Sequence, residues 1–147
     1  MRRNRLYCAD GSLSEHGEQV VFVDWAIDNK KKKTEGWIPK EQQLLFYAIP
    51  NGARVSIGTA VKLKAEGLRK GAPDIIFDWP RLGYHGLRIE MKRKEGGVIS
   101  PEQRAIHDAL RKAGYSVHVC KGANDAERIM RWYMLSISPI DVSENKL

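Results

Sequence analysis

The sequence predicts an α/β domain in which helices flank a mixed central sheet. Helical segments and short apolar strands follow one another in the order helix, short helix, strand, helix, strand, strand, helix, strand, helix. With 147 residues, 42% of them hydrophobic and 29% charged, the chain can bury one core and has an ordinary globular composition. We therefore expect a single domain over residues 1–147, with its core over about residues 12–134, a basic arm before it and a frayed tail after it.

Three helices and one strand are expected in the N-terminal half. The helices are expected over residues 13–27, 39–44 and 60–69, and the strand over residues 46–49. Ser12 and Glu15 have the spacing of a capping box at the start of the first helix. Thr59 can cap the third helix. The residues at 50–52 form a turn signal that would end the strand.

The C-terminal half is expected to complete the sheet and to add two helices. Strands are expected over residues 74–77, 87–92 and 116–120. Proline and glycine separate the first two strands, so they should form an antiparallel hairpin. Ser100, followed by proline and then by Gln103, marks a helix start, and Gly114 can end that helix. Asn124 or Asp125 can cap the last helix.

Composition favours a polyanionic partner and argues against several classes of protein. No apolar run approaches the roughly 18 residues that cross a bilayer, and no signal-peptide core follows the basic start. We therefore expect a cytoplasmic protein with no membrane contact and no organic cofactor. The two cysteines and four histidines lack the spacing of a zinc site. A net charge of +7 favours nucleic acid, because lysine and arginine make most phosphate contacts.

Two acidic residues and a lysine are expected to meet at one end of the hairpin. Asp74 opens one strand, and Glu90 and Lys92 close the next. Successive side chains of a strand point to opposite faces, so Glu90 and Lys92 share a face while Met91 points toward the core. Antiparallel pairing would bring Asp74 beside this end of the second strand.

This group suits the hydrolysis of a phosphodiester bond, which needs an activated water and neutralisation of developing charge. Carboxylate oxygens of Asp74 and Glu90, with the backbone carbonyl of Met91, would hold Mg²⁺ or Mn²⁺. Lys92 would orient the water or stabilise negative charge. The alternative is a strand start next to a solvated ion pair without catalytic role, and the short pattern alone leaves both open.

Further residues are assigned by their positions. Gln103 can complete a capping box, act at the site, or do both, because the N-terminus of its helix can lie above the site and favour phosphate. Basic residues on and around the third helix are expected to contact the DNA backbone; they are Arg54, Lys62, Lys64, Arg69 and Lys70. Four consecutive lysines at 30–33 either contact DNA or only increase solubility.

Four blocks of the sequence resemble the VRR-NUC family, the virus-type replication-repair nucleases of the PD-(D/E)xK superfamily. The blocks are residues 67–74, 85–92, 100–103 and 114–115, they occur in the family's order, and the resemblance covers about residues 12–134. It implies a restriction-endonuclease-like core with metal ligation by Asp74 and Glu90. It also implies catalytic roles for Lys92 and Gln103.

The resemblance further implies a glutamate on the first helix. Residues 16–19 match that block and favour Glu18. Glu15 competes for the role, although a capping box would explain it structurally. Standalone members of the family are implied to be homodimers that act on branched DNA such as four-way junctions.

The expected function is therefore a Mg²⁺- or Mn²⁺-dependent endodeoxyribonuclease that selects DNA by structure, with Holliday junctions or other branched DNA as substrate. No base-reading module is evident, which favours recognition of DNA shape. The alternatives are a sequence-specific restriction-type nuclease and a catalytically silent DNA-binding scaffold. A basic RNA-binding protein is less well supported, because aromatic residues are not interleaved on a strand face.

Overall fold

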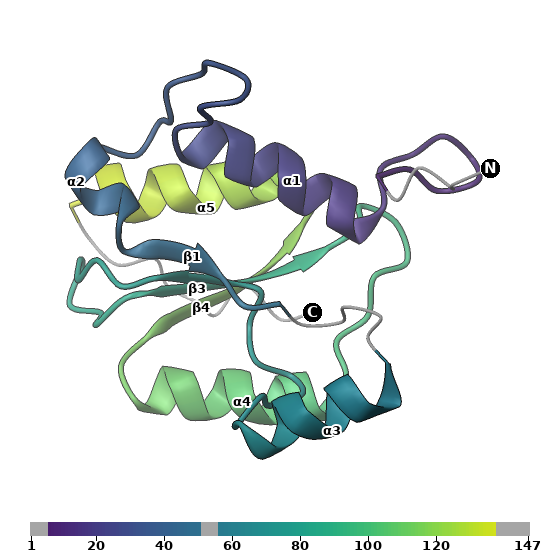
Figure 1. Cartoon of the computed structure of the whole chain (residues 1–147). Helices are drawn as coiled ribbons and strands as arrows, with labels where there is room; N and C mark the ends of the chain where they lie inside the picture. Colours follow the sequence, from purple (N-terminus) through teal and green to yellow (C-terminus); the bar gives the residue numbers. More distant parts are fainter. Residues whose placement is uncertain (1–5, 51–55, 138–147) are drawn as a thin grey trace.

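The computed structural model describes residues 6–50 and 56–137, where helices and strands follow one another in the predicted order. The helices are α1 (Glu15–Ala26), α2 (Lys40–Gln43), α3 (Ile57–Ala65), α4 (Pro101–Lys112) and α5 (Ala123–Leu135). The strands are β1 (Phe46–Ala48), β2 (Ile75–Phe77), β3 (Leu87–Lys92) and β4 (Ser116–Lys121). Helices α1 and α5 cover one face of the sheet, and α4 covers the other with α3 beside it (Figure 1). The predicted α/β class with a mixed sheet is confirmed.

Some predictions fall on residues outside the described part of the chain. These are the basic arm before residue 6, Arg54, and all but the start of the tail. The turn at 50–52 is described only at Pro50. Among the described helices, none is both long and apolar enough to cross a membrane.

The described strands form one sheet in the order β1-β2-β3-β4. Strand β2 pairs antiparallel with β3, with Ile75 opposite Ile89, which confirms the predicted hairpin. Strand β4 pairs parallel with β3, and α4 makes the crossover between them. Strand β3 therefore lies inside the sheet, with a partner on each side.

The starts of α1 and α3 differ from the prediction. Ser14, not Ser12, caps α1, and its hydroxyl accepts a hydrogen bond from the Gly17 amide. Ser12 is not available for this role because its hydroxyl and amide both bond to Asp10. Ser56, not Thr59, caps α3 and accepts from the Thr59 amide. Helix α3 is also shifted toward the N-terminus of the chain and ends at residue 65 rather than 69.

The start of α4 is as predicted. Ser100 accepts from the Gln103 amide, and the Gln103 side chain accepts from the Ser100 amide, which makes a complete capping box. The prediction for α5 is wrong, because its N-cap residue is Gly122 and neither Asn124 nor Asp125 caps it. Asp125 instead accepts a hydrogen bond from the Lys121 amide, across the turn before the helix.

Both faces of β3 are covered, and they differ in chemistry. Leu87, Ile89 and Met91 are fully buried in the main apolar core, together with residues of α1 and α5. The alternate residues carry charges and are buried as well: Glu90 is 1% exposed and Lys92 is 5% exposed. Charges held away from water need partners. The fold thus places two charged groups where only each other, neighbouring polar groups or a ligand can stabilise them.

Candidate active site

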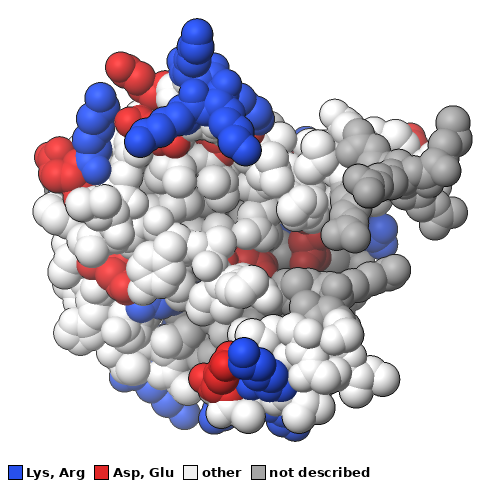
Figure 2. Space-filling view, in the orientation of Figure 1, with Lys and Arg blue, Asp and Glu red and all other residues white. Residues whose placement is uncertain are grey.

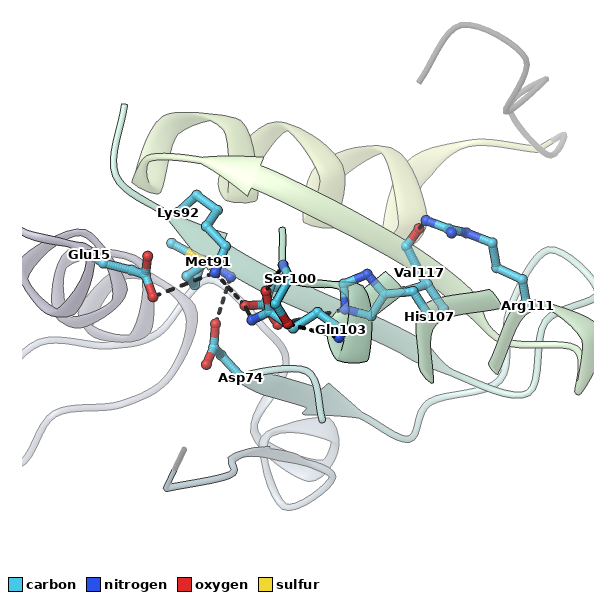
Figure 3. Close-up of polar contacts among 10 residues, drawn as sticks. Glu15, Asp74, Met91, Lys92, Ser100, Gln103, His107, Arg111 and Val117 are labelled. Atoms are coloured by element: carbon cyan, nitrogen blue, oxygen red, sulfur yellow. Dashed lines mark hydrogen bonds and ion pairs between the residues drawn. The ribbon is translucent and has the colours of Figure 1, made fainter. Parts of the chain in front are cut away.

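Asp74 and Glu90 lie at the same end of the β2–β3 hairpin. The register pairs Ile75 with Ile89, so one more step places Asp74 opposite Glu90. Residues opposite each other in an antiparallel pair point to the same face. The Asp74 carboxylate accepts a 2.8 Å hydrogen bond from the Met91 amide, which fixes it beside β3 (Figure 3). The predicted meeting of two carboxylates from separate strands is therefore present.

Glu90 is held by two donors that reach the same oxygen. Its Oε1 accepts from Lys92 Nζ at 2.6 Å and from Gln103 Nε2. Gln103 uses its own Oε1 to accept from the Ser100 amide at 2.9 Å. The side chain therefore caps α4, as one of the two interpretations of Gln103 predicted, and contacts Glu90 at the same time (Figure 3). Helix α4 is thereby tied to the charged face of β3.

The two candidate glutamates of α1 lie in different places. Glu15, in the first turn, lies with its Oε1 3.7 Å from Lys92 Nζ (Figure 3). Glu18 is 2% exposed, and its Oε2 accepts a 2.8 Å hydrogen bond from the Ala123 amide at the start of α5. The structure brings Glu15 to Asp74, Glu90 and Lys92, and it does not bring Glu18 there.

A cavity of about 470 Å³ opens beside these groups. Residues of α1, β3, α4 and the stretch from α3 to β2 line it: Glu15, Lys64, Leu68, Lys70, Gly71, Asp74, Glu90 and Gln103. In the space-filling view, acidic side chains lie in a hollow between the levels of α1 and α3 (Figure 2). The cavity thus has three carboxylates in its lining, from Glu15, Asp74 and Glu90, and Lys92 lies next to them.

Burial and like charge shift the proton affinities at the site. Burial and the neighbouring charge of Glu90 raise the pKa of Asp74 to about 7, against the smaller effects of the Met91 amide and Lys92. Burial alone would lower the pKa of Lys92, but its hydrogen bond to Glu90 and the charges of Glu90, Glu15 and Asp74 raise it overall. Lys92 is therefore an ammonium ion at neutral pH and acts as a donor and a positive charge.

His107, which is not among the predicted site residues, also lies beside this group. It is 1% exposed, and its Nε2 lies 3.6 Å from Glu90 Oε2. Neither of these two buried atoms has a hydrogen-bond partner among the described residues. The signal was present in the sequence, because His107 follows Gln103 by four positions and residues so spaced share a helix face.

The predicted DNA-binding residues differ in how close they lie to the cavity. Lys64 and Lys70 line it, and Lys70 Nζ also lies 3.3 Å from Glu102 Oε1. Lys62 is exposed, and its Nζ lies 3.8 Å from Oε1 of Glu66, the C-cap residue of α3. Arg69 is exposed in the segment after α3.

The donor set suits a divalent metal ion. Asp74 and Glu90 both line the cavity, and burial and the charge of Glu90 raise the pKa of Asp74. Glu90 Oε2 is buried without a hydrogen-bond partner in the described chain. Hard carboxylate oxygens are the ligands that Mg²⁺ and Mn²⁺ prefer. No group of three or more His, Cys, Asp or Glu side chains in the described residues is arranged for a metal. An ion here would therefore also need backbone and water oxygens, which Mg²⁺ commonly uses.

A carboxylate at the start of one hairpin strand, a Glu-x-Lys at the end of the next and a glutamate on the first helix define a nuclease of the PD-(D/E)xK class. The family model for the VRR-NUC domain matches residues 13–124. A solved structure described as a VRR_NUC domain protein shares 30% sequence identity with the chain, with a TM-score of 0.66 over 84% of this chain and 89% of the other. None of the curated proteins matches. The chain belongs to the VRR-NUC family, a family of nucleases that act on DNA and generally use divalent metal ions.

Proposed function

We propose that this protein is an endonuclease that depends on Mg²⁺ or Mn²⁺ and hydrolyses phosphodiester bonds of branched DNA, including Holliday junctions. The observation that carries the proposal is the convergence of Asp74 and Glu90 with Lys92 at a cavity that opens to the surface. In this proposal Asp74, Glu90 and the Met91 carbonyl hold the metal ion. A bound divalent ion would lower the pKa of a coordinated water and neutralise charge on the phosphate.

Each remaining residue has a role that its contacts support. Lys92, kept protonated by the surrounding carboxylates, orients the attacking water and stabilises negative charge on the phosphate. Gln103 keeps the Glu90 carboxylate in place through its amide. We assign the role of the first-helix acid to Glu15 instead of Glu18, because Glu15 lies at the cavity and its side chain is 47% exposed, within reach of water.

Lys64 and Lys70 would contact the phosphates on either side of the cut, because both line the cavity. In the proposal Lys62 and Arg69 extend this contact surface. Arg54, which we also propose as a DNA contact, lies outside the described residues. We further propose that the active form is a homodimer, since two-fold symmetry places two sites against two strands of a symmetric junction.

The test is cleavage of labelled four-way junction, flap and linear duplex DNA in Mg²⁺, in Mn²⁺ and in EDTA. We expect metal-dependent cutting of the branched substrates, and loss of cutting in Asp74→Ala and Lys92→Ala while DNA binding persists. Lys112→Ala is the matched control, since Lys112 is an exposed lysine at the far end of α4. Undiminished cleavage by either site variant would reject the proposed site.

Two other outcomes would identify the alternatives. Cutting of linear duplex at one sequence, without preference for branched DNA, would indicate a restriction-type nuclease. Binding of DNA without cleavage in any metal ion would indicate a catalytically silent scaffold.

A further inference from the structure

A second basic surface lies away from the cavity, on the segment between α1 and α2. Its tip is the lysine loop, residues 29–34, in which Lys30, Lys31, Lys32 and Lys33 are all exposed. In the space-filling view these lysines form the blue cluster at the top of the molecule, on the same visible face as the acidic hollow (Figure 2). The sequence left open whether this run contacts DNA or only increases solubility.

The backbone of the lysine loop is fixed by hydrogen bonds. Asn29 and Thr34 exchange two backbone bonds, of 3.0 and 3.2 Å. The Asn29 side chain accepts from the amides of Lys31 and Lys32, each at 3.1 Å, as in an Asx turn. Lys33 adopts a φ of 54°, in the left-handed region. The lysines therefore project from a folded turn, which lowers the entropy lost when such a surface binds a ligand.

The base of the segment is braced against the rest of the molecule. The Trp25 carbonyl accepts from the Trp37 amide at 2.9 Å, and the two indole rings stack with centroids 4.9 Å apart. The Arg131 guanidinium of α5 lies 5.0 Å from each ring centroid. At Gly36 the two ends of the segment approach so closely that a Cβ would lie 2.4 Å from Ile27 Cα. The loop is thus held in one position relative to α1 and α5.

The charges of the loop are mostly unbalanced. Lys32 pairs with Asp24 on α1. Among the described residues no acidic side chain pairs with Lys30, Lys31 or Lys33. Adjacent like charges repel one another, and this repulsion is relieved when a polyanion replaces their counterions. A run of phosphates is the ligand that matches several neighbouring ammonium groups.

The position of the loop complements the acidic cavity. Glu15 begins α1 and the loop follows its end, so the 12 residues of α1 separate them, about 18 Å at the usual helical rise. That span corresponds to roughly five base pairs of duplex at about 3.4 Å each. A duplex arm that enters the cavity and runs along α1 would pass the loop once it extends more than about five base pairs beyond the cavity.

We propose that the lysine loop is a second DNA-binding site, which holds the phosphate backbone of a duplex arm beyond the cavity. The loop would bind the sugar-phosphate backbone of duplex DNA and make no contact with the bases. The inference rests on the proposed function only in taking DNA as the substrate. It predicts that affinity depends on arm length, because a short arm reaches the cavity but not the loop.

The test compares two double variants of equal charge change, with DNA binding measured by fluorescence anisotropy in EDTA. Lys30→Gln with Lys31→Gln removes loop charges and leaves the Lys32–Asp24 pair intact. Lys112→Gln with Lys121→Gln removes two exposed lysines elsewhere. With 20-base-pair duplexes we expect about tenfold weaker binding by the loop variant, and a salt slope smaller by about two, since each lost phosphate contact contributes about 0.9.

A DNA hairpin with a stem of about four base pairs is too short to reach the loop, so the loop variant should bind it within about twofold of the unaltered protein. The control double variant should stay within about twofold of the unaltered protein with both DNA lengths. Equal losses of DNA affinity in both double variants would show that only the net charge of the protein matters, and this would overturn the proposal. Unchanged affinity in the loop variant would also overturn it.

Cleavage assays keep the two proposals separate. A protein that cuts junctions but binds long duplexes equally well without Lys30 and Lys31 refutes only the loop site, whereas a protein that neither binds nor cuts DNA refutes both.

Discussion

The buried carboxylate of Glu18 accepts a 2.8 Å hydrogen bond from the backbone amide of Ala123, 105 positions further along the chain. Helix α5 starts at Ala123, and its N-cap residue, Gly122, offers no side-chain acceptor. Unpaired amides at a helix N-terminus need an acceptor, and negative charge there is favourable. Glu18 therefore caps α5 from α1 and joins the two helices that cover one face of the sheet.

This relationship predicts opposite effects for the two glutamates of α1. Glu18→Ala should lower the free energy of unfolding by about 1–3 kcal/mol, because a buried amide loses its partner. Glu15→Ala should change stability by less than about 0.5 kcal/mol, since Glu15 is exposed, but reduce junction cleavage at least 100-fold. Urea unfolding and single-turnover cleavage measure the two properties. Full cleavage by Glu15→Ala, with cleavage lost in a stable Glu18→Ala, would return the catalytic role to Glu18.

Asp74 should be a source of instability in the metal-free protein. Burial and the charge of Glu90 raise its pKa to about 7 from an ordinary value of 3.8, so the folded state binds the proton more tightly than the unfolded state. Stability due to this group is therefore full at low pH and is lost as pH rises from about 4 to 7. Asp74→Asn keeps an acceptor for the Met91 amide and removes the charge. We expect it to raise stability at pH 8 by about 2–4 kcal/mol while abolishing cleavage.

Thermal unfolding in EDTA at pH 5 and pH 8 checks this expectation. The advantage of Asp74→Asn over the unaltered protein should grow between the two pH values. Added Mg²⁺ should stabilise the unaltered protein and leave the variant unchanged, because in the proposed function the ion would bind only the folded site with both carboxylates present. If Asp74→Asn were less stable than the unaltered protein at pH 8 in EDTA, the folded state would accommodate the Asp74 carboxylate without a cation, contrary to this prediction.

The hairpin and its charged face could be predicted from the sequence because they depend on local rules. Side chains alternate along β3, so Glu90 and Lys92 had to share a face, and the short connection to β2 required antiparallel pairing. The register then placed Asp74 opposite Glu90. The start of α4 was equally local, since Ser100 and Gln103 complete their capping box within one turn.

The features that the sequence did not reveal depend on residues far apart in the chain. The cap of α5 comes from Glu18 on α1, so no search near Gly122 could find it. The choice between Glu15 and Glu18 depends on how α1 lies over the end of β3, which a helix pattern does not specify. The contact of His107 with Glu90 likewise required the packing of α4 on the charged face of the sheet.

Gly71 allows the segment before β2 to approach α4. It adopts a φ of +92°, and a Cβ there would lie 2.9 Å from the Gln103 backbone nitrogen. Gly71→Ala should therefore displace the first turn of α4. The side-chain amide of Gln103, which donates a hydrogen bond to Glu90, would move with it. We expect stability to fall by about 2–3 kcal/mol and cleavage to fall at least tenfold.

Gly67→Ala separates this close approach from backbone strain. Gly67 has a similar φ of +96°, but a Cβ there would meet nothing within 4 Å. The Gly67→Ala substitution should lower stability by about 1 kcal/mol and leave the cleavage rate within about twofold of the unaltered protein. Equal loss of cleavage in both variants would show that strain in the α3–β2 segment matters, and that contact with α4 does not.

His118 should make the fold sensitive to acid. Its ring lies 2.8 Å from the Ser116 hydroxyl and packs on Trp132, and burial, aided by the positive charges of Arg111 and Arg128, lowers its pKa to about 4. The unfolded chain binds a proton near pH 6.5, so the stability from this group is full above that pH and is lost as pH falls toward 4.

Substitution of His118 by glutamine isolates this contribution, because an amide can still bond to Ser116 but does not titrate. Between pH 7 and pH 4 the unaltered protein should lose about 3 kcal/mol more stability than His118→Gln, measured by urea unfolding. Contributions of the carboxylates are common to both proteins and cancel in the comparison. His16→Gln, at an exposed position of α1, should follow the unaltered protein throughout. Parallel curves for all three proteins would mean that the His118 ring is protonated in the folded state without cost, contrary to its burial between Ser116 and Trp132.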